Sequence, residues 1–392
     1  MTGRRWTSIA IVTLGLGIGG GGLAWCLKGA GGPSRPASAA ATAKTPMRAL
    51  AEGIATGDAR ALAALCRRVL SNDKPRATPP GEAEAIDLVA VLDGLRAGFL
   101  KFDTVGRCSS IAASTHILDQ FKAEGAPGQW LDALKPVHDL MVAGLADPAV
   151  DVRAVALTEV GRHWSWLPGR PMIPAEEGAL DEWKEALHKP ALRCLGDREP
   201  KSRAAAVVCL GQLPIDSMAA PAAAYADDPD SGGVRYKALT TFANRPALLS
   251  EDTILRRLHD AEPGIPELAE LILKGRGLTK DQVFLGRQMF DPKAEIRCSV
   301  IPLLRERTDI DPVIWLLQLS HDADETVRAH AAEALADRDT PEVDKRLREM
   351  ATTDASPAVR SEAAKCVAKL AHQATAALPP LPGSPSLNPK AN

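Results

Sequence analysis

The side chains best suited to metal binding or nucleophilic catalysis are scattered along this chain. The eight histidines form no HExxH pair, and the seven cysteines form no CxxC or CxxCH motif. A glycine-rich stretch at residues 17–22 lacks the lysine of a phosphate-binding loop, and the acidic turn at 321–325 lacks the spacing of a calcium loop. The sequence therefore predicts no catalytic residues, no metal site and no cofactor.

The cysteines have the spacing of structural residues. Cys26 lies in an apolar N-terminal segment, and the other six fall where a helix would place a small buried residue: Cys66, Cys108, Cys194, Cys209, Cys298 and Cys366. We predict that these six are buried free thiols. The alternative is that Cys194 and Cys209 face each other across one helix pair and form a disulfide in an oxidising compartment.

A short motif occurs seven times between residues 146 and 372. Aligned on one anchor position, the copies have Arg153, Arg203, Arg235, Pro266, Arg297, Arg328 and Arg360. Successive spacings are 50, 32, 31, 31, 31 and 32 residues, so the period is 31–32 with one insertion of about 18 residues. Six copies have an aspartate six positions before the anchor: Asp147, Asp197, Asp260, Asp291, Asp322 and Asp354. The third copy has Pro229 there.

Apolar residues in each copy lie on one face of a helix. They recur at offsets −1, +3 and +7 from the anchor, and the +3 residue is alanine in six copies. A second apolar segment precedes each aspartate, as in residues 311–320. Each repeat is therefore expected to be two antiparallel helices that need the next repeat to bury their faces. The predicted fold is all-α, an α-solenoid of stacked helix pairs, and aromatic residues at only 4% agree with closely packed helices.

This motif resembles the HEAT-repeat family, in particular the short HEAT-like units also found in phycobilin lyases. The resemblance covers residues 136–372. It implies that the aspartates and arginines are structural and form a ladder of hydrogen-bonded charges between neighbouring repeats: Asp147, Arg153, Asp197, Arg203, Arg235, Asp291, Arg297, Asp322, Arg328, Asp354 and Arg360. Each aspartate stands at the start of the second helix, where a carboxylate can accept hydrogen bonds from free backbone N–H groups.

Two regions depart from the motif. Pro266 is tolerable in the first turn of a helix but supplies no charge, so a local weakness or change of curvature is expected around residues 255–300. Residues 46–145 are predicted to be an irregular helical region, in which Val105, Arg107 and Ala112 resemble the later copies too faintly to be counted. The repeat array proper is expected at residues 146–372.

The N-terminal residues 1–28 predict a membrane anchor. Arg4 and Arg5 precede 22 uncharged residues, 6–27, which as a helix would span about 33 Å. A cleaved signal peptide is the alternative, with small residues at 37–39 as the processing site and a secreted product. In both cases we expect the repeats to lie outside the cytoplasm. Residues 29–45 read as a flexible linker, and residues 373–392 as a disordered Pro-rich tail.

The stretch at residues 161–183, which contains the insertion at 164–180, concentrates residues typical of interfaces. Trp164, Trp166 and Trp183 are three of the seven tryptophans, and Arg170 lies between them. Insertions in solenoids map to loops that are often functional, so these four residues are candidates for partner binding. The alternative is that the rings fold back and cover the junction between repeats.

These patterns predict a binding protein. The net charge of −2 indicates no overall attraction for nucleic acid, and no small-molecule site is evident. Stacked helix pairs create an extended surface without placing a reactive group on it. We therefore predict a membrane-anchored scaffold that binds another protein and is not an enzyme. The alternative, a lyase or chromophore-handling enzyme that absorbs visible light, rests on the resemblance to phycobilin lyases alone.

Overall fold

The computed structural model describes residues 45–70, 82–121, 127–164, 174–213, 215–307 and 310–376. Every regular element in these ranges is a helix, which confirms the predicted all-α class. The predicted membrane segment, the linker at 29–44 and the end of the tail lie outside the described residues. No helix within the described ranges has both the length and the apolar character needed to cross a membrane.

The helices form two compact units. Unit 1 ends at Leu248, and unit 2 begins at Leu249. Unit 1 contains α2 (Pro46–Thr56), α3 (Ala59–Leu70), α4 (Glu82–Gly98), η1 (Phe99–Lys101), α5 (Thr104–Gln120), α6 (Pro127–Leu145), α7 (Val150–Trp164), α8 (Pro174–Leu195), α9 (Pro200–Gly211), α10 (Asp216–Ala223), η2 (Ala224–Asp227) and α11 (Gly232–Phe242). Unit 2 contains α12 (Glu251–Arg257), α13 (Ile265–Gly275), α14 (Lys280–Met289), α15 (Ala294–Glu306), α16 (Pro312–Leu319), α17 (Glu325–Leu335), α18 (Pro341–Thr353) and α19 (Pro357–Ala376).

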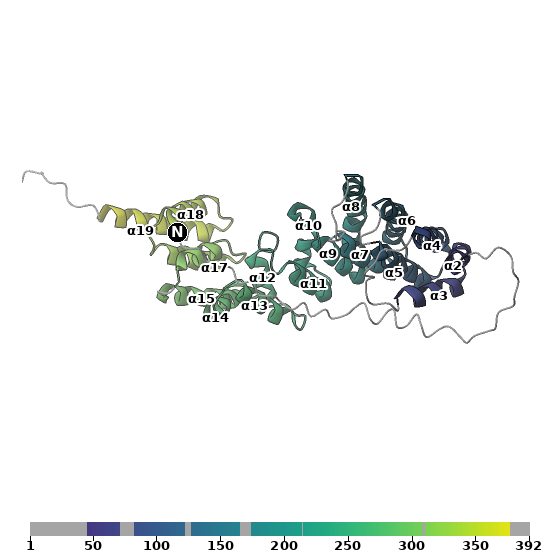
Figure 1. Cartoon of the computed structure of the whole chain (residues 1–392). Coiled ribbons are helices and arrows are strands. Elements are labelled where there is room, and N and C mark those ends of the chain that lie inside the picture. Colours follow the sequence, from purple (N-terminus) through teal and green to yellow (C-terminus); the bar gives the residue numbers. More distant parts are fainter. Residues whose placement is uncertain are drawn as a thin grey trace, which may run out of the picture. The chain divides into compact units, whose positions relative to one another are not determined.

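Unit 1 consists of two layers of helices (Figure 1). The first helices of the pairs, α2, α4, α6 and α8, pack on one another in chain order, and so do the second helices α3, α5, α7, α9 and α11. The helices of residues 46–145 thus stack in the same two layers as the repeats that follow. In unit 2 the second helices α15, α17 and α19 also pack in order.

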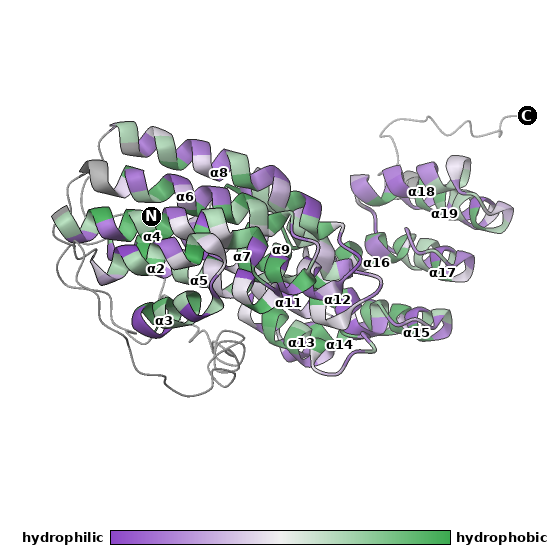
Figure 2. Cartoon of the chain, turned by 90° about the vertical axis from the view of Figure 1, so that its right-hand side faces the viewer, coloured by the Kyte–Doolittle hydropathy of each residue, from purple (hydrophilic) through white to green (hydrophobic). Residues whose placement is uncertain are grey.

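The face predicted from offsets −1, +3 and +7 is the buried face of the second helices. In α7, for example, Val152, Ala156 and Val160 are fully buried, and in α17 the same holds for Val327, Ala331 and Leu335. Helices α7 and α17 thus each bury one apolar side, and Figure 2 shows hydrophobic and hydrophilic residues side by side on the helices. Burying these apolar stripes against neighbouring pairs is what holds the stack together.

Glycines allow the closest helix contacts in unit 1. A Cβ atom added to Gly98 of α4 would lie 2.0 Å from the carbonyl oxygen of Ile54 in α2, and one added to Gly94 would lie 2.5 Å from that of Ala51. No side chain fits in either place. Helices α2 and α4, the first helices of two successive pairs, therefore pack backbone against backbone.

Candidate functional site

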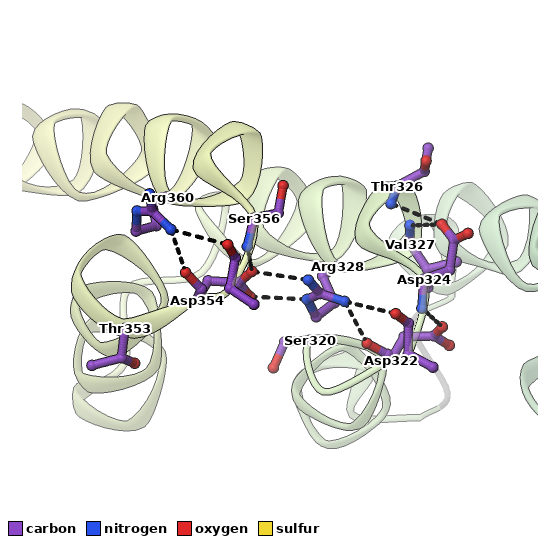
Figure 3. A network of polar contacts seen from close by, with 12 residues as sticks. Ser320, Asp322, Asp324, Thr326, Val327, Arg328, Thr353, Asp354, Ser356 and Arg360 are labelled. Atoms are coloured by element: carbon purple, nitrogen blue, oxygen red, sulfur yellow. Dashed lines mark hydrogen bonds and ion pairs between the residues drawn. The ribbon is translucent and has the colours of Figure 1, made fainter.

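The geometry that recurs at the repeat junctions is clearest around Arg328 (Figure 3). Its Nη1 donates to the backbone oxygens of Asp322 and Ala323, both at 2.9 Å, and so closes the turn of its own repeat. Its Nε and Nη2 donate to the two carboxylate oxygens of Asp354 in the next repeat, also at 2.9 Å. One guanidinium thus ties a turn to the following turn, with the bidentate geometry that suits arginine and carboxylate.

The same arrangement recurs at other junctions, and we call the whole set the Asp–Arg ladder. Its further links join Arg153 to Asp197, Arg203 to Asp228, and Arg297 to Asp322. Nη1 of each anchor arginine also donates to the backbone oxygen of an upstream aspartate: Asp147 for Arg153, Asp197 for Arg203, Asp228 for Arg235, Asp291 for Arg297, and Asp354 for Arg360. The side chains of a rung therefore come from different repeats, not from one motif.

Two members of the ladder escape the sequence pattern. Arg107 in α5 contacts Asp147 through Nε at 2.7 Å and donates to the carbonyl of Phe102, so it is an anchor although its copy was too faint to count. Asp228 takes the place expected at Pro229, one position earlier. Asp228 is followed by a proline, as are Asp147 and Asp291 in two other copies. This Asp-Pro dipeptide, which stands one residue earlier relative to the anchor in the third copy, is the signal that would have identified Asp228.

The ladder aspartates close turns and do not cap the second helices. Oδ1 of Asp147 accepts from the backbone N–H of Ala149 at 2.9 Å, and Oδ1 of Asp354 from that of Ser356 at 2.8 Å. Both donors precede the helix that follows. In the repeat of α17, the capping residue is instead Asp324, which accepts from the N–H groups of Thr326 and Val327.

Pro266 interrupts the ladder within unit 2. It occupies the first turn of α13, where it has no side-chain donor for Asp291 of the next repeat. The group that faces Asp291 there is His259, with Nδ1 at 3.9 Å from Oδ2, while Nε2 of His259 lies 2.6 Å from the Arg287 carbonyl oxygen. Helices α13 and α15 also hardly touch each other, whereas α15 and α17 pack directly.

We therefore expect α13 to be the least protected second helix of unit 2. Hydrogen exchange measured by mass spectrometry on the full chain should show faster exchange in peptides from α13 than in those from α17, because fewer contacts must break for local opening. The Val359→Ala variant is the control. Val359 is buried in α19, so this change should speed hydrogen exchange in unit 2 away from α13. Equal protection of α13 and α17 in the wild-type chain would contradict a weak junction at Pro266.

Acid is expected to weaken unit 2 through the ladder. The hydrogen bonds from Arg328 hold the pKa of the Asp354 carboxyl below its ordinary value. Since the folded-state pKa is the lower one, this contribution to stability is present at neutral pH and is lost as the pH falls below about 4. Urea unfolding followed by circular dichroism should therefore show a falling free energy of unfolding in acid. The Asp354→Asn variant should be less stable at pH 7, and its free energy of unfolding should fall less in acid than that of the wild-type chain. An equal fall in both chains would contradict this prediction.

The tryptophans of the insertion that the structure describes are interior residues. Trp164, at the end of α7, is 2% exposed and Trp183, in α8, is 3% exposed. The His163 ring lies edge-on to that of Trp183, with centroids 6.0 Å apart. Part of the insertion extends α8 to 22 residues. Trp166 and Arg170 lie outside the described residues, so their part in partner binding stays a prediction.

The six described cysteines are free thiols, and the Cys194–Cys209 pair is not bridged. Cys194 lies beside Ser202, which precedes Cys209 by two turns of α9, or about 10 Å along the axis. Burial raises the pKa of both, which makes them poor nucleophiles.

A groove of about 330 Å³ lies between α7 and α9 in unit 1. Gly161 and Cys209 form its floor, and Thr158 and Val208 line its sides. A Cβ atom added to Gly161 would lie 3.0 Å from the Cα of Cys209, so this glycine sets how closely the two helices approach. Arg162 stands at one end. The groove is thus formed by the second-helix layer, and sequence spacing alone did not indicate it.

Comparison with known proteins identifies the repeats. A model of HEAT repeats matches residues 290–382, which confirms the resemblance read from the motif. The comparison with curated proteins gives no match. Matching solved structures include one titled "Structural Basis of Tubulin Recruitment and Assembly by Microtubule Polymerases with Tumor Overexpressed Gene (TOG) Domain Arrays", at 11% identity over 79% of this chain and 75% of that chain, with a TM-score of 0.32. A likeness at this level says nothing about what the present chain binds.

Proposed function

We propose that this HEAT-repeat chain is a scaffold that binds another protein, without catalysis of its own. Residues 6–27 anchor it in a membrane, and its repeats lie outside the cytoplasm. The anchor is supported by the apolar run of the N-terminal sequence. A secreted form, released by cleavage near residues 37–39, is the competing version of the same function.

The observation that carries the proposal is how the repeats use their charged residues. The ladder arginines and aspartates are engaged in holding successive turns together, and the side chains of the Arg203–Asp228 rung are only 7% and 2% exposed. Burial raises the pKa of the thiols of Cys194, Cys209 and Cys366, which lowers their reactivity. What the two layers offer to solvent is therefore their outward helix faces, which together form the kind of extended surface that repeat proteins use for binding.

Capture of a protein partner tests the scaffold. The tagged full-length chain is crosslinked in its own membranes and the recovered proteins are identified by mass spectrometry. The control is residues 1–45 carrying the same tag, which keeps the anchor and lacks the repeats. We expect at least one protein to be enriched by the full chain over this control; enrichment of none would overturn the proposal.

Membrane fractionation tests the anchor separately. The full chain should remain with the membranes after washing with high salt, while a chain lacking residues 1–28 should be released, because the apolar segment supplies the attachment. Release of both would contradict anchoring and leave the partner experiment unaffected.

A further inference from the structure

The last anchor arginine of the Asp–Arg ladder uses only one of its nitrogens within the described residues. Nη1 of Arg360 closes its own turn by donating to the backbone oxygens of Asp354 at 2.6 Å and Ala355 at 3.2 Å. In Figure 3 both bonds leave from this one nitrogen, and the other two lie on the side away from Asp354. Nε and Nη2 of Arg360 contact no carboxylate in the part of the chain that the structure describes.

Four other anchors show what that edge of the guanidinium binds when a further repeat follows. Nε and Nη2 contact an aspartate of the next repeat in Arg153, Arg203, Arg297 and Arg328. In all four, as in Arg360, Nη1 is held by two backbone oxygens of the preceding turn. The turn therefore fixes the guanidinium of Arg360 in the orientation that receives a carboxylate, and little side-chain freedom remains to be lost on binding one.

The surface beside Arg360 is the side of a second helix on which the next second helix packs. Offset +8 from the anchor marks this side, because a Cβ atom added to Gly161 of α7 would meet Cys209 of α9, and one added to Gly211 of α9 would meet Thr241 of α11. Offset +4 lies about one turn earlier on the same side. It is buried in the four second helices that pack directly on their successors, at Leu157, Val207, Ile301 and Ala332.

In α19 this side is exposed, and we call it the free side of α19: Ser361, Ala364 and Ala368, at offsets +1, +4 and +8. Helix α13 gives the contrast, because its offset +4 is Glu270, which pairs with Lys274, and α15 hardly touches it. Like the four packed helices, α19 has an uncharged residue at offset +4. The free side of α19 therefore has the chemistry of a packed junction, with the arginine of the rung already in place.

The residues that follow α19 bring no side chain that could complete the rung. Residues 377–392 contain no aspartate or glutamate, and their one charged side chain, Lys390, has the same sign as Arg360. In the four rungs that Arg360 resembles, the aspartate stands three or four residues before the helix that packs. The element that fits the free side is therefore a helix with a carboxylate in the turn before it.

We propose that the free side of α19 binds a helix of the partner protein, and that an aspartate or glutamate just before that helix pairs with Arg360. This inference rests on the proposed scaffold function and names the partner's element and its charge. The partner is then held as a further layer on the stack, by the same contacts that join one repeat to the next.

Site-specific photocrosslinking in the full-length chain locates the partner. The photoreactive residue p-benzoylphenylalanine replaces Ala368 on the free side of α19 or, as a matched control, the exposed Thr352 of α18. After irradiation in native membranes, mass spectrometry identifies the crosslinked peptide. We expect position 368, and not position 352, to capture a protein whose crosslinked segment is a helix preceded by aspartate or glutamate.

Removing the charge of Arg360 gives the second measurement. Arg360→Gln should reduce capture at position 368 by at least about tenfold, because the partner's carboxylate loses its cation. Arg348→Gln, which removes an exposed guanidinium paired with Asp344 of the same α18, should leave capture unchanged. Circular dichroism verifies that each variant is folded. Should Arg360→Gln fail to fold, Ala364→Arg replaces it, because it fills the free side and leaves the turn of Arg360 intact.

A double-mutant cycle then tests the pairing itself. The captured partner is produced with its carboxylate residue changed to the matching amide, and its affinity for the full-length chain is measured. The amide should weaken binding by about the same factor as Arg360→Gln, and the two changes together should weaken it little further. Independent losses that multiply would show that the carboxylate does not bind Arg360.

The outcomes separate this inference from the scaffold proposal. If the full-length chain enriches a partner but position 368 captures no more than position 352, the site on α19 is overturned and the scaffold stands. Capture that Arg360→Gln leaves unchanged, or capture of a second copy of this chain, overturns the proposed pairing with a partner's carboxylate. If the full-length chain enriches no protein, the scaffold proposal itself fails.

Discussion

Replacing Arg203 with alanine is expected to lower the free energy of unfolding of unit 1 by about 3–5 kcal/mol, the range measured when one partner of a buried ion pair is removed. Arg203 donates to both carboxylate oxygens of Asp228, at 2.8 and 3.1 Å, and to the backbone oxygens of Asp197 and Arg198, both at 3.0 Å. The hydrogen bonds with Asp228 raise the pKa of the guanidinium. Alanine would leave the Asp228 carboxylate buried without its cation and two turn carbonyls without their donor.

Urea unfolding followed by tryptophan fluorescence measures this loss, because Trp130, Trp164 and Trp183 are all buried in unit 1. Arg348→Ala is the matched control: it removes an exposed pair with Asp344 at a comparable 2.8 Å and should stay close to wild type. The free energy of unfolding of Arg203→Lys should lie between those of the wild-type chain and Arg203→Ala. One ammonium group cannot donate to both carboxylate oxygens and both carbonyl oxygens. Equal stability of Arg203→Ala and Arg348→Ala would show that the ladder does not hold the repeats together.

The sequence predicts the repeat fold well because its information is local. The offsets −1, +3 and +7 describe one helix, and a short turn leaves few ways to join two of them. Arg107 and Asp228 show where this stops. A rung joins an arginine of one repeat to an aspartate of the next. A copy whose own spacing is irregular can therefore still supply a side chain that pairs with the neighbouring repeat. Spacing identified the motif, but only the stack shows which repeats it connects.

The groove between α7 and α9 could not be predicted for a related reason. Its floor depends on Gly161 and Cys209, which come from neighbouring repeats separated by the 18-residue insertion and share no motif. Aligning the repeats compares equivalent positions, so it does not show which residues of neighbouring repeats contact each other. Thr158 and Val208, which line the sides of the groove, each stand five residues after their anchor arginine. The spacing alone does not show that the two residues border the same groove.

Replacing Trp164 with alanine is expected to cost about 3–5 kcal/mol of unfolding free energy, as is usual for a buried tryptophan. The indole is among the largest fully buried side chains, and deleting it leaves a cavity where α7 ends. Its N–H finds no acceptor in the described part of the chain, and the same is true of Trp183, so both rings contribute through packing and not through polar contacts. Trp164→Phe should therefore recover much of the loss, because it refills the space without the unpaired donor.

The partner experiment then separates packing from binding at this position. Because Trp164 is only 2% exposed, the folded fraction of the Trp164→Phe variant should recover as much partner as the wild-type chain. Trp315→Ala, at a partly buried ring of unit 2, controls for loss of a tryptophan as such and should leave unit 1 unchanged. If Trp164→Phe keeps its stability but loses the partner, the ring must become exposed on binding, and the interface would include the end of α7.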